Sequence, residues 1–260
     1  MGGLALAGIV RLWREAGVGA GVRRWQAGSF LLGWLATGVA VLSPLDALGE
    51  RRFWLHMVQH EMMMLVAAPL LVLGSPLAAL VWGLPARWRG PAARWTRRLG
   101  LQAATRVLST PLTAWWVHAV VLWAWHAPAL FEAALRRSWV HDLQHLSFFG
   151  SALLFWWGLF QGGHGPGRGR HGAAVFYLFT TTVHTAVLGA LLTVSERVWY
   201  PVYLERASWG TLSALEDQQL GGLIMWVPGG VVYMVAALVL FARWMDDGPE
   251  RAAPATGAGQ

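Results

Sequence analysis

Cysteine and lysine are both absent from this sequence of 260 residues, and charged residues make up only 13% of it. Without cysteine the chain forms no disulfide and offers no thiolate, so any metal would be held by His, Met, Asp or Glu. A soluble domain of this length normally carries about a quarter charged residues. The low charge and the hydrophobic content of 56% therefore favour a membrane protein over a soluble one.

Six stretches are long and apolar enough to cross the ~30 Å hydrocarbon core of a bilayer as helices. They cover residues 26–43, 54–82, 110–128, 140–161, 172–194 and 219–243. The sequence thus predicts an all-α fold, a polytopic transmembrane helical bundle of six spans. We expect the bundle to occupy residues 26–245, after an interfacial segment over 1–25 and before a disordered tail over 246–260.

The arginines predict how this bundle is oriented. If the N-terminus lies inside, fourteen of the twenty arginines fall on the inner side and six on the outer side. Because positive charge is retained on the cytoplasmic side, both termini are expected in the cytoplasm. The arginines are spread over the loops between apolar runs rather than gathered in one stripe, so the net charge of +7 does not predict binding of nucleic acid.

Histidine is the residue type whose placement points to function. Nine are present, and seven lie in or at the edge of a predicted span. Ionisable side chains inside a membrane are costly and usually functional. The pairs His56/His60 and His141/His145 are each four residues apart, at the starts of the second and fourth spans. This spacing places both rings of a pair on one helix face, about 6 Å apart, close enough to bind one ion.

The predicted topology brings further groups to the same depth. The second and fourth spans start at the outer surface, where the third span ends and the sixth begins. A metal site near that surface is therefore predicted, with these ligands: His56, His60, His126, His141, His145 and Asp217. Two more histidines, His118 and His184, lie about 15 Å deeper and would form a second station. His164 and His171 are expected in a solvated inner loop.

The residues alone leave the bound group open. Imidazole with thioether from Met63 and Met64 suits Cu(I). Zinc with an open water position would instead make an intramembrane hydrolase, with Glu61 or Asp142 as its base. Histidines on two facing helices would suit haem. The remaining alternative is that the histidines only form hydrogen bonds between helices.

Short motifs follow one another in a distinctive order along residues 40–235. They are Ser43-Pro44-Leu45-Asp46, His56-Met57 with Gln59-His60, Trp125-His126-Ala127-Pro128, His141 with Gln144-His145, His184, Tyr200-Pro201 and Asp217-Gln218-Gln219. In this order they resemble the CtaG-like family of integral membrane cytochrome c oxidase assembly factors. The family resemblance also suggests one more span near the N-terminus, which would raise the number from six to seven.

The resemblance implies an accessory role in maturing a haem–copper terminal oxidase, with no catalytic residue of its own. We therefore expect a non-enzymatic, multi-pass protein of the bacterial inner membrane, with zinc or haem as the alternatives to copper. Its copper would bind at the extracytoplasmic side and pass to an oxidase subunit. The expected ligands are those of the outer cluster together with His184.

Overall fold

The structure is a computed structural model, and it describes residues 2–74, 76–98, 107–108, 110–161, 168–206 and 212–246. Within these ranges every regular element is a helix, which confirms the all-α prediction. The helices are α1 (Gly2–Ala16), α2 (Arg24–Leu42), α3 (Pro44–Gly49), α4 (Phe53–Glu61), η1 (Met62–Ala67), α5 (Ala68–Leu73), α6 (Pro76–Gly83), α7 (Ala86–Arg98), α9 (Pro111–His126), α10 (Pro128–Arg136), α11 (Ser138–Gln161), α12 (Arg168–Val194), α13 (Val202–Arg206) and α14 (Ala214–Asp246).

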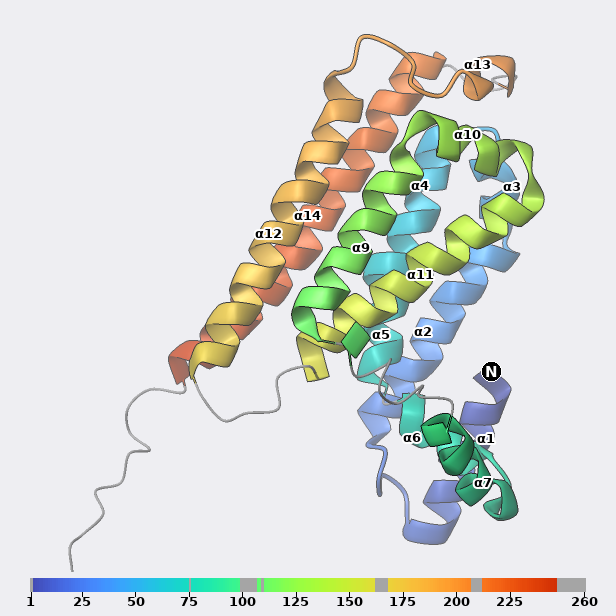
Figure 1. Cartoon of the computed structure of the whole chain (residues 1–260), viewed down its shortest axis with the longest axis vertical. Coiled ribbons are helices and arrows are strands. Elements are labelled where there is room, and N and C mark those ends of the chain that lie inside the picture. Colours follow the sequence, from blue (N-terminus) through green and yellow to red (C-terminus); the bar gives the residue numbers. More distant parts are fainter. Residues whose placement is uncertain are drawn as a thin grey trace, which may run out of the picture.

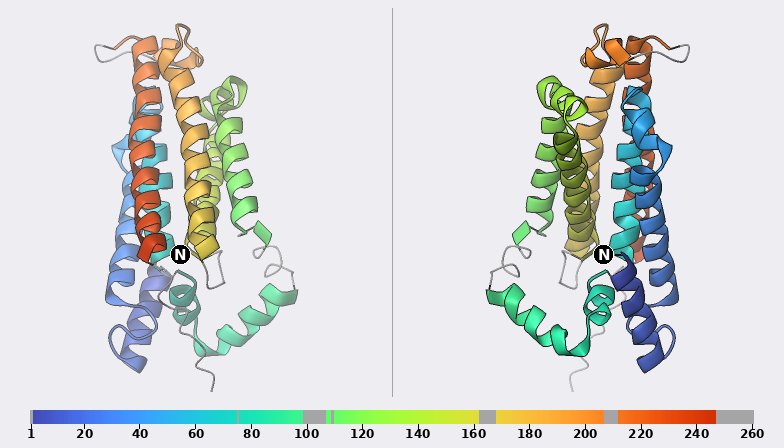
Figure 2. Two further views of the ribbon diagram at one scale, coloured as in Figure 1. Left: turned by 90° about the vertical axis from the view of Figure 1, so that its left-hand side faces the viewer. Right: turned by 90° about the vertical axis from the view of Figure 1, so that its right-hand side faces the viewer.

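The long helices run alongside one another, and short helices gather at the two ends (Figure 1). At one end lie α3, α10 and α13, and at the other lie α1, α6 and α7 (Figure 2). Helices α12 and α14 form a closely packed pair, in which a Cβ added to Gly222 would lie 2.7 Å from the carbonyl oxygen of Gly189. Small residues allow such backbone contact between membrane helices, so this pair depends on glycine at both positions.

Four segments are long and apolar enough to cross a membrane: Arg24–Leu42, Phe53–Leu73, Gly172–Val194 and Ala214–Met245. They match the first, second, fifth and sixth predicted spans. Helices α9 and α11 occupy the other two predicted positions. At 16 residues α9 is short for a span, which needs roughly 17–25. In α11, which has 24 residues, polar side chains such as Gln144 dilute the apolar run. Six spans therefore stay a prediction.

The second predicted span, 54–82, is one helical rod only as far as Leu73. The rod ends at Gly74, and the separate helix α6 begins at Pro76, so the predicted boundary was wrong by about two turns. Pro76 has no N–H and cannot continue the hydrogen-bond pattern of the preceding helix, which fits a break at this point. Apolar composition continues through the break, and for this reason hydropathy alone did not reveal it.

The rod contains a π-helical turn, η1, immediately before Pro69. In this turn the N–H of Ala68 donates to the carbonyl of Met63, five residues earlier. The next carbonyl in that pattern, that of Met64, faces Pro69, which has no N–H to donate. The indole Nε1 of Trp156 in α11 donates to it instead, at 2.8 Å. A side chain of α11 thus completes the backbone of the neighbouring rod.

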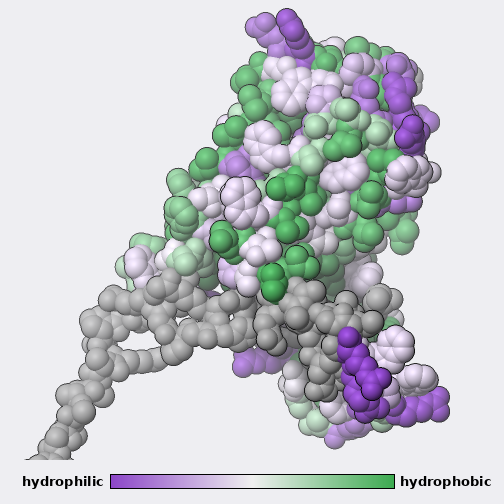
Figure 3. All heavy atoms as spheres, in the orientation of Figure 1, coloured by the Kyte–Doolittle hydropathy of each residue, from purple (hydrophilic) through white to green (hydrophobic). Residues whose placement is uncertain are grey.

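The surface has the character expected of a bilayer protein. On the face that Figure 3 shows, apolar and weakly polar side chains predominate along the bundle, and the most hydrophilic ones gather mainly toward its two ends. The first helix, α1, packs on α6 through Ala5, Ile9 and Leu12, which are all buried. Whether residues 1–25 lie at the membrane interface stays a prediction. Except for Asp246, which ends α14, the predicted tail lies outside the described residues.

Candidate metal centre

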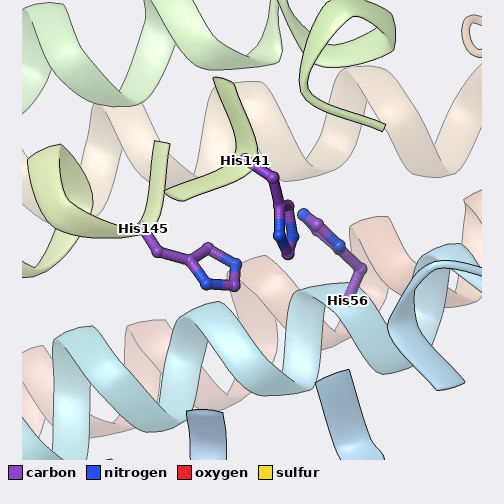
Figure 4. A group of neighbouring side chains, drawn as sticks. All are labelled: His56, His141 and His145. Carbon is purple, nitrogen blue, oxygen red and sulfur yellow. The ribbon is translucent and has the colours of Figure 1, made fainter. Parts of the chain in front are cut away.

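Three of the predicted ligands meet between α4 and α11. One ligand atom from each of His56, His141 and His145 lies within 4.8 Å of the others. His141 and His145 project from α11 toward His56 on α4 (Figure 4). Their ring centroids are 4.1 Å apart, and they lie 5.6 and 6.0 Å from that of His56. The i, i+4 spacing in α11 therefore places two imidazoles opposite a third on the neighbouring helix.

Two other predicted ligands surround this trio. The ring centroid of His60 is 4.2 Å from that of His56 and 5.3 Å from that of His145. His126, at the end of α9, is an electrostatic neighbour of His56 and His60. Its Nδ1 donates a hydrogen bond to the carbonyl of Leu122 at 2.7 Å. This bond leaves Nε2 as the unprotonated nitrogen, the form that binds a metal.

Most imidazole nitrogens of this cluster are buried without a hydrogen-bond partner. Within the cluster, as far as the structure describes it, these are both ring nitrogens of His60 and Nε2 of His126, His141 and His145, whereas the side chain of Gln144 acts on His56. Each unsatisfied buried polar group costs about 1–3 kcal/mol, so native proteins rarely keep several together. Histidines acting only as links between helices would be hydrogen-bonded. Unpartnered nitrogens that converge fit a bound cation better.

Aromatic rings close the cluster on the side of α10. The ring of Phe131 lies 5.1 Å from that of His56, and Tyr200 stacks on Phe131 at 4.1 Å. The hydroxyl of Tyr200 donates to the carbonyl of His126 at 2.9 Å. Burial raises the pKa of this phenol above its ordinary value, so the hydroxyl stays protonated and remains a donor. The rings cover that side of the histidine cluster.

Asp217 takes a different position from the one expected of a ligand. Its two carboxylate oxygens accept backbone N–H groups at the start of α4, from Phe53 at 2.9 Å and from Trp54 at 3.1 Å. The first N–H groups of a helix have no partner within it, and a carboxylate beside them also suits the helix dipole. Asp217 thus caps α4 from another helix, about one turn above His56, and does not belong to the trio.

The deeper histidines form a second group. Nδ1 of His118 is hydrogen-bonded to Ser151 Oγ at 3.1 Å, and His184 is its electrostatic neighbour. Both nitrogens of His184 are buried without a partner, and its ring lies 5.4 Å from that of Trp115. His171 lies within α12 rather than in a loop, and His164 lies outside the described residues.

The two carboxylates considered as bases for a hydrolase lie away from the cluster. Glu61 faces α14, where a Cβ added to Gly229 would lie 3.2 Å from Oε2. Asp142 is exposed on α11. Neither is therefore placed to activate a water at the trio.

The sequence did not identify Phe131 as a residue of the site. It is an apolar residue in a short helix, and nothing in the sequence indicates that its ring packs on that of His56.

Comparisons with known proteins bear on the whole chain. The family described as the cytochrome c oxidase caa3 assembly factor (Caa3_CtaG) matches residues 4–247. Two uncharacterized proteins, from Mycobacterium bovis and Mycobacterium tuberculosis, are each 30% identical over 254 residues. The alignment covers 93% of this chain but only 38% of each relative, so the chain spans well under half of their length. No solved structure matches this chain.

Proposed function

Because the chain belongs to the cytochrome c oxidase caa3 assembly factor family, we propose that it binds copper for the maturation of a haem–copper terminal oxidase. The observation that carries the proposal is the convergence of three imidazoles whose ligand atoms lie within 4.8 Å of one another. His60 and His126 would complete the ligand set. The proposed role is that of an accessory protein without catalytic activity.

The donor set fits copper, and the family favours copper over the alternatives. The trio supplies nitrogen and no carboxylate, and imidazole binds both oxidation states of copper well. A site with three protein ligands leaves a position through which the ion can be exchanged. A zinc hydrolase would also need a base at the site, and Glu61 faces another helix. Ligand atoms this close together suit one ion rather than a haem.

The site lies toward the end of the bundle that carries α3, α10 and α13 (Figure 1). We place that end at the extracytoplasmic face of the bacterial inner membrane, because the arginines lie mainly on the other side. This placement goes with six spans and with both termini in the cytoplasm. Copper would enter from outside and pass sideways within the bilayer to an oxidase subunit. His184, with His118, would form a deeper station on that route.

We propose that Asp217 supports the metal site indirectly, by capping α4. By holding the first turn of α4, it fixes the height at which His56 faces α11. Its carboxylate oxygens already accept two backbone N–H groups, so its effect on the metal would be indirect. The metal-free and metal-bound forms would share this cap.

The test is the metal content of the full chain, purified without a histidine tag after exposure to Cu(I) and Zn(II) together. A His56→Ala/His145→Ala variant is compared with His171→Ala, which alters a histidine near the start of α12. We expect the wild type and the control to retain copper and the double variant to lose it. Zinc in place of copper would favour the hydrolase, and a Soret band would favour haem. Absence of metal from all three proteins would refute the proposal.

A further inference from the structure

A carboxylate that the histidine pattern did not predict lies beside the metal centre. Asp46 belongs to the first turn of α3, and its Oδ1 accepts a hydrogen bond of 2.7 Å from Nε2 of Gln59. Gln59 is fully buried on α4, between the two histidines of that helix. Its Nε2 also donates to the carbonyl of Ala40 at 2.9 Å. Gln59 therefore holds the carboxylate next to the metal-binding face of α4.

The short helix that carries Asp46 is fixed in place. Its last residue, Gly49, packs so closely on α4 that an added Cβ would lie 3.2 Å from Cα of His56. The hydroxyl of Tyr203 donates to the carbonyl of Gly49 at 3.0 Å. Asp46 also acts electrostatically on His145, on the opposite side of the cluster. The carboxylate thus faces both helices that supply the trio.

A cation held by neutral imidazoles brings its full charge into a buried site, and burying an uncompensated charge is costly. We propose that Asp46 is the counter-charge of the metal centre and favours a divalent ion over a monovalent one. This inference rests on the proposed function. Because Coulomb energy is proportional to the charge of the ion, the carboxylate stabilises a divalent ion twice as strongly as a monovalent ion.

The test is Asp46→Asn, which keeps an oxygen for Gln59 to donate to and removes the charge. Affinities of the reconstituted full chain are measured for Zn(II) and for Ag(I), which represent the two valences without redox change. Loss of an outer partner of a metal ligand typically weakens binding roughly 10–100-fold. We expect the affinity for Zn(II) to fall by that factor. For Ag(I) the lost free energy is half as large, so its affinity should fall about 3–10-fold. Asp46→Glu should restore most of the Zn(II) affinity.

The matched control is Asp142→Asn, which removes an exposed carboxylate next to His141 in sequence and should leave both affinities unchanged. Equal losses of affinity for the two ions would overturn the inference. They would mean that Asp46 supports the structure of the site and that its charge does not matter. Unchanged affinities in Asp46→Asn would also overturn it while leaving the proposed function intact. If the wild type bound neither ion and also retained no copper, the proposed function itself would fail. Melting temperatures of all variants show whether folding has changed.

A separate observation concerns α7, at the other end of the bundle (Figure 1). Arg87, Arg94 and Arg98 are exposed and spaced by seven and four residues, so they form one row along the helix. Trp88 and Trp95, 54% and 66% exposed, form a second row beside it. Among the described residues none of these arginines forms an ion pair. The helix therefore presents a row of free positive charge next to a row of indole rings.

The start of α7 is held against the end of α6 by a different arginine. Arg89 donates to the carbonyls of Leu84 and Trp82, each at 3.2 Å, and its guanidinium lies 4.2 Å from the ring centre of Trp82. This attachment fixes how the helix is rotated. Arginine and tryptophan side by side on a helix suit the boundary between headgroups and acyl chains. We infer that α7 lies on the inner membrane surface, with its arginine row on the phosphates of anionic phospholipids.

The absence of cysteine makes this inference simple to test. The full-length Trp95→Cys variant, labelled with an environment-sensitive fluorophore, is reconstituted in phosphatidylcholine nanodiscs with and without phosphatidylglycerol. We expect a blue shift that grows with phosphatidylglycerol and disappears when Arg87, Arg94 and Arg98 are changed to Gln. The control label at Trp139→Cys, at the start of α11, should not respond to these three changes. A label on α7 that ignores anionic lipid, or that responds only to added RNA or acidic peptide, would overturn the inference.

Discussion

The Asp217→Ala substitution tests whether Asp217 acts as the cap of α4 or as a metal ligand. The change leaves the N–H groups of Phe53 and Trp54 buried without the carboxylate that now accepts them at 2.9 and 3.1 Å. Each unsatisfied buried donor costs about 1–3 kcal/mol, so the two together should destabilise the protein by about 2–6 kcal/mol. Asp217→Asn keeps one acceptor oxygen and should cost about half as much. Both substitutions should lower the free energy of unfolding even in the metal-free protein.

The measurement is denaturant unfolding of the metal-free protein in detergent, followed by circular dichroism and by tryptophan fluorescence. Glu196→Ala is the control, because this exposed carboxylate lies in the loop after α12 and its loss should change stability by less than about 0.5 kcal/mol. If Asp217→Ala unfolded like the wild type but no longer retained copper, the residue would be a ligand. The capping argument would then be wrong.

Other changes test the packing around the site. Trp156→Phe removes the indole donor to Met64 and should cost about 1–3 kcal/mol in thermal or denaturant unfolding. Adding Pro69→Ala should recover part of that loss, because alanine supplies the missing N–H, and a purely additive effect would contradict this account. Gly222→Ala should destabilise the α12–α14 pair by about 1–3 kcal/mol, since its Cβ meets a backbone oxygen at 2.7 Å. Phe131→Ala should speed metal release, measured by transfer to a chelator, whereas Phe131→Leu should change it little.

Much of the bundle could be predicted because hydropathy reports where a helix is apolar. Four of the six predicted spans coincide with segments long and apolar enough to cross a membrane. The break after Leu73 was missed because the composition on both sides of it is equally apolar. The π-helical turn was missed for a different reason. It depends on which donor lies opposite the carbonyl of Met64, and that donor comes from a residue 92 positions later.

At the site, helical spacing predicted the His141/His145 pair, and the predicted topology placed His56 at the same depth; in the structure one nitrogen from each of the three lies within 4.8 Å of the others. Depth alone could not show which of the predicted residues would meet. Asp217 lies at the depth expected of a ligand, but its oxygens are engaged by the N-terminus of α4. Asp46 appeared only in the Ser43-Pro44-Leu45-Asp46 motif, and nothing in the sequence connected it with the histidines, because it lies on a short helix outside the predicted spans. Its proximity to the cluster depends on how α3 folds back onto α4.

The capping of α4 by Asp217 also sets an order of events during synthesis. The carboxylate and the backbone N–H of Phe53 are separated by 164 residues along the chain. At 5–20 residues per second, roughly 8–33 s pass between the translation of the two. During that interval the first turn of α4 has no cap, and the helix that supplies it has not yet entered the membrane. The first turn of α4 therefore reaches its capped form only after the start of α14 has been synthesised.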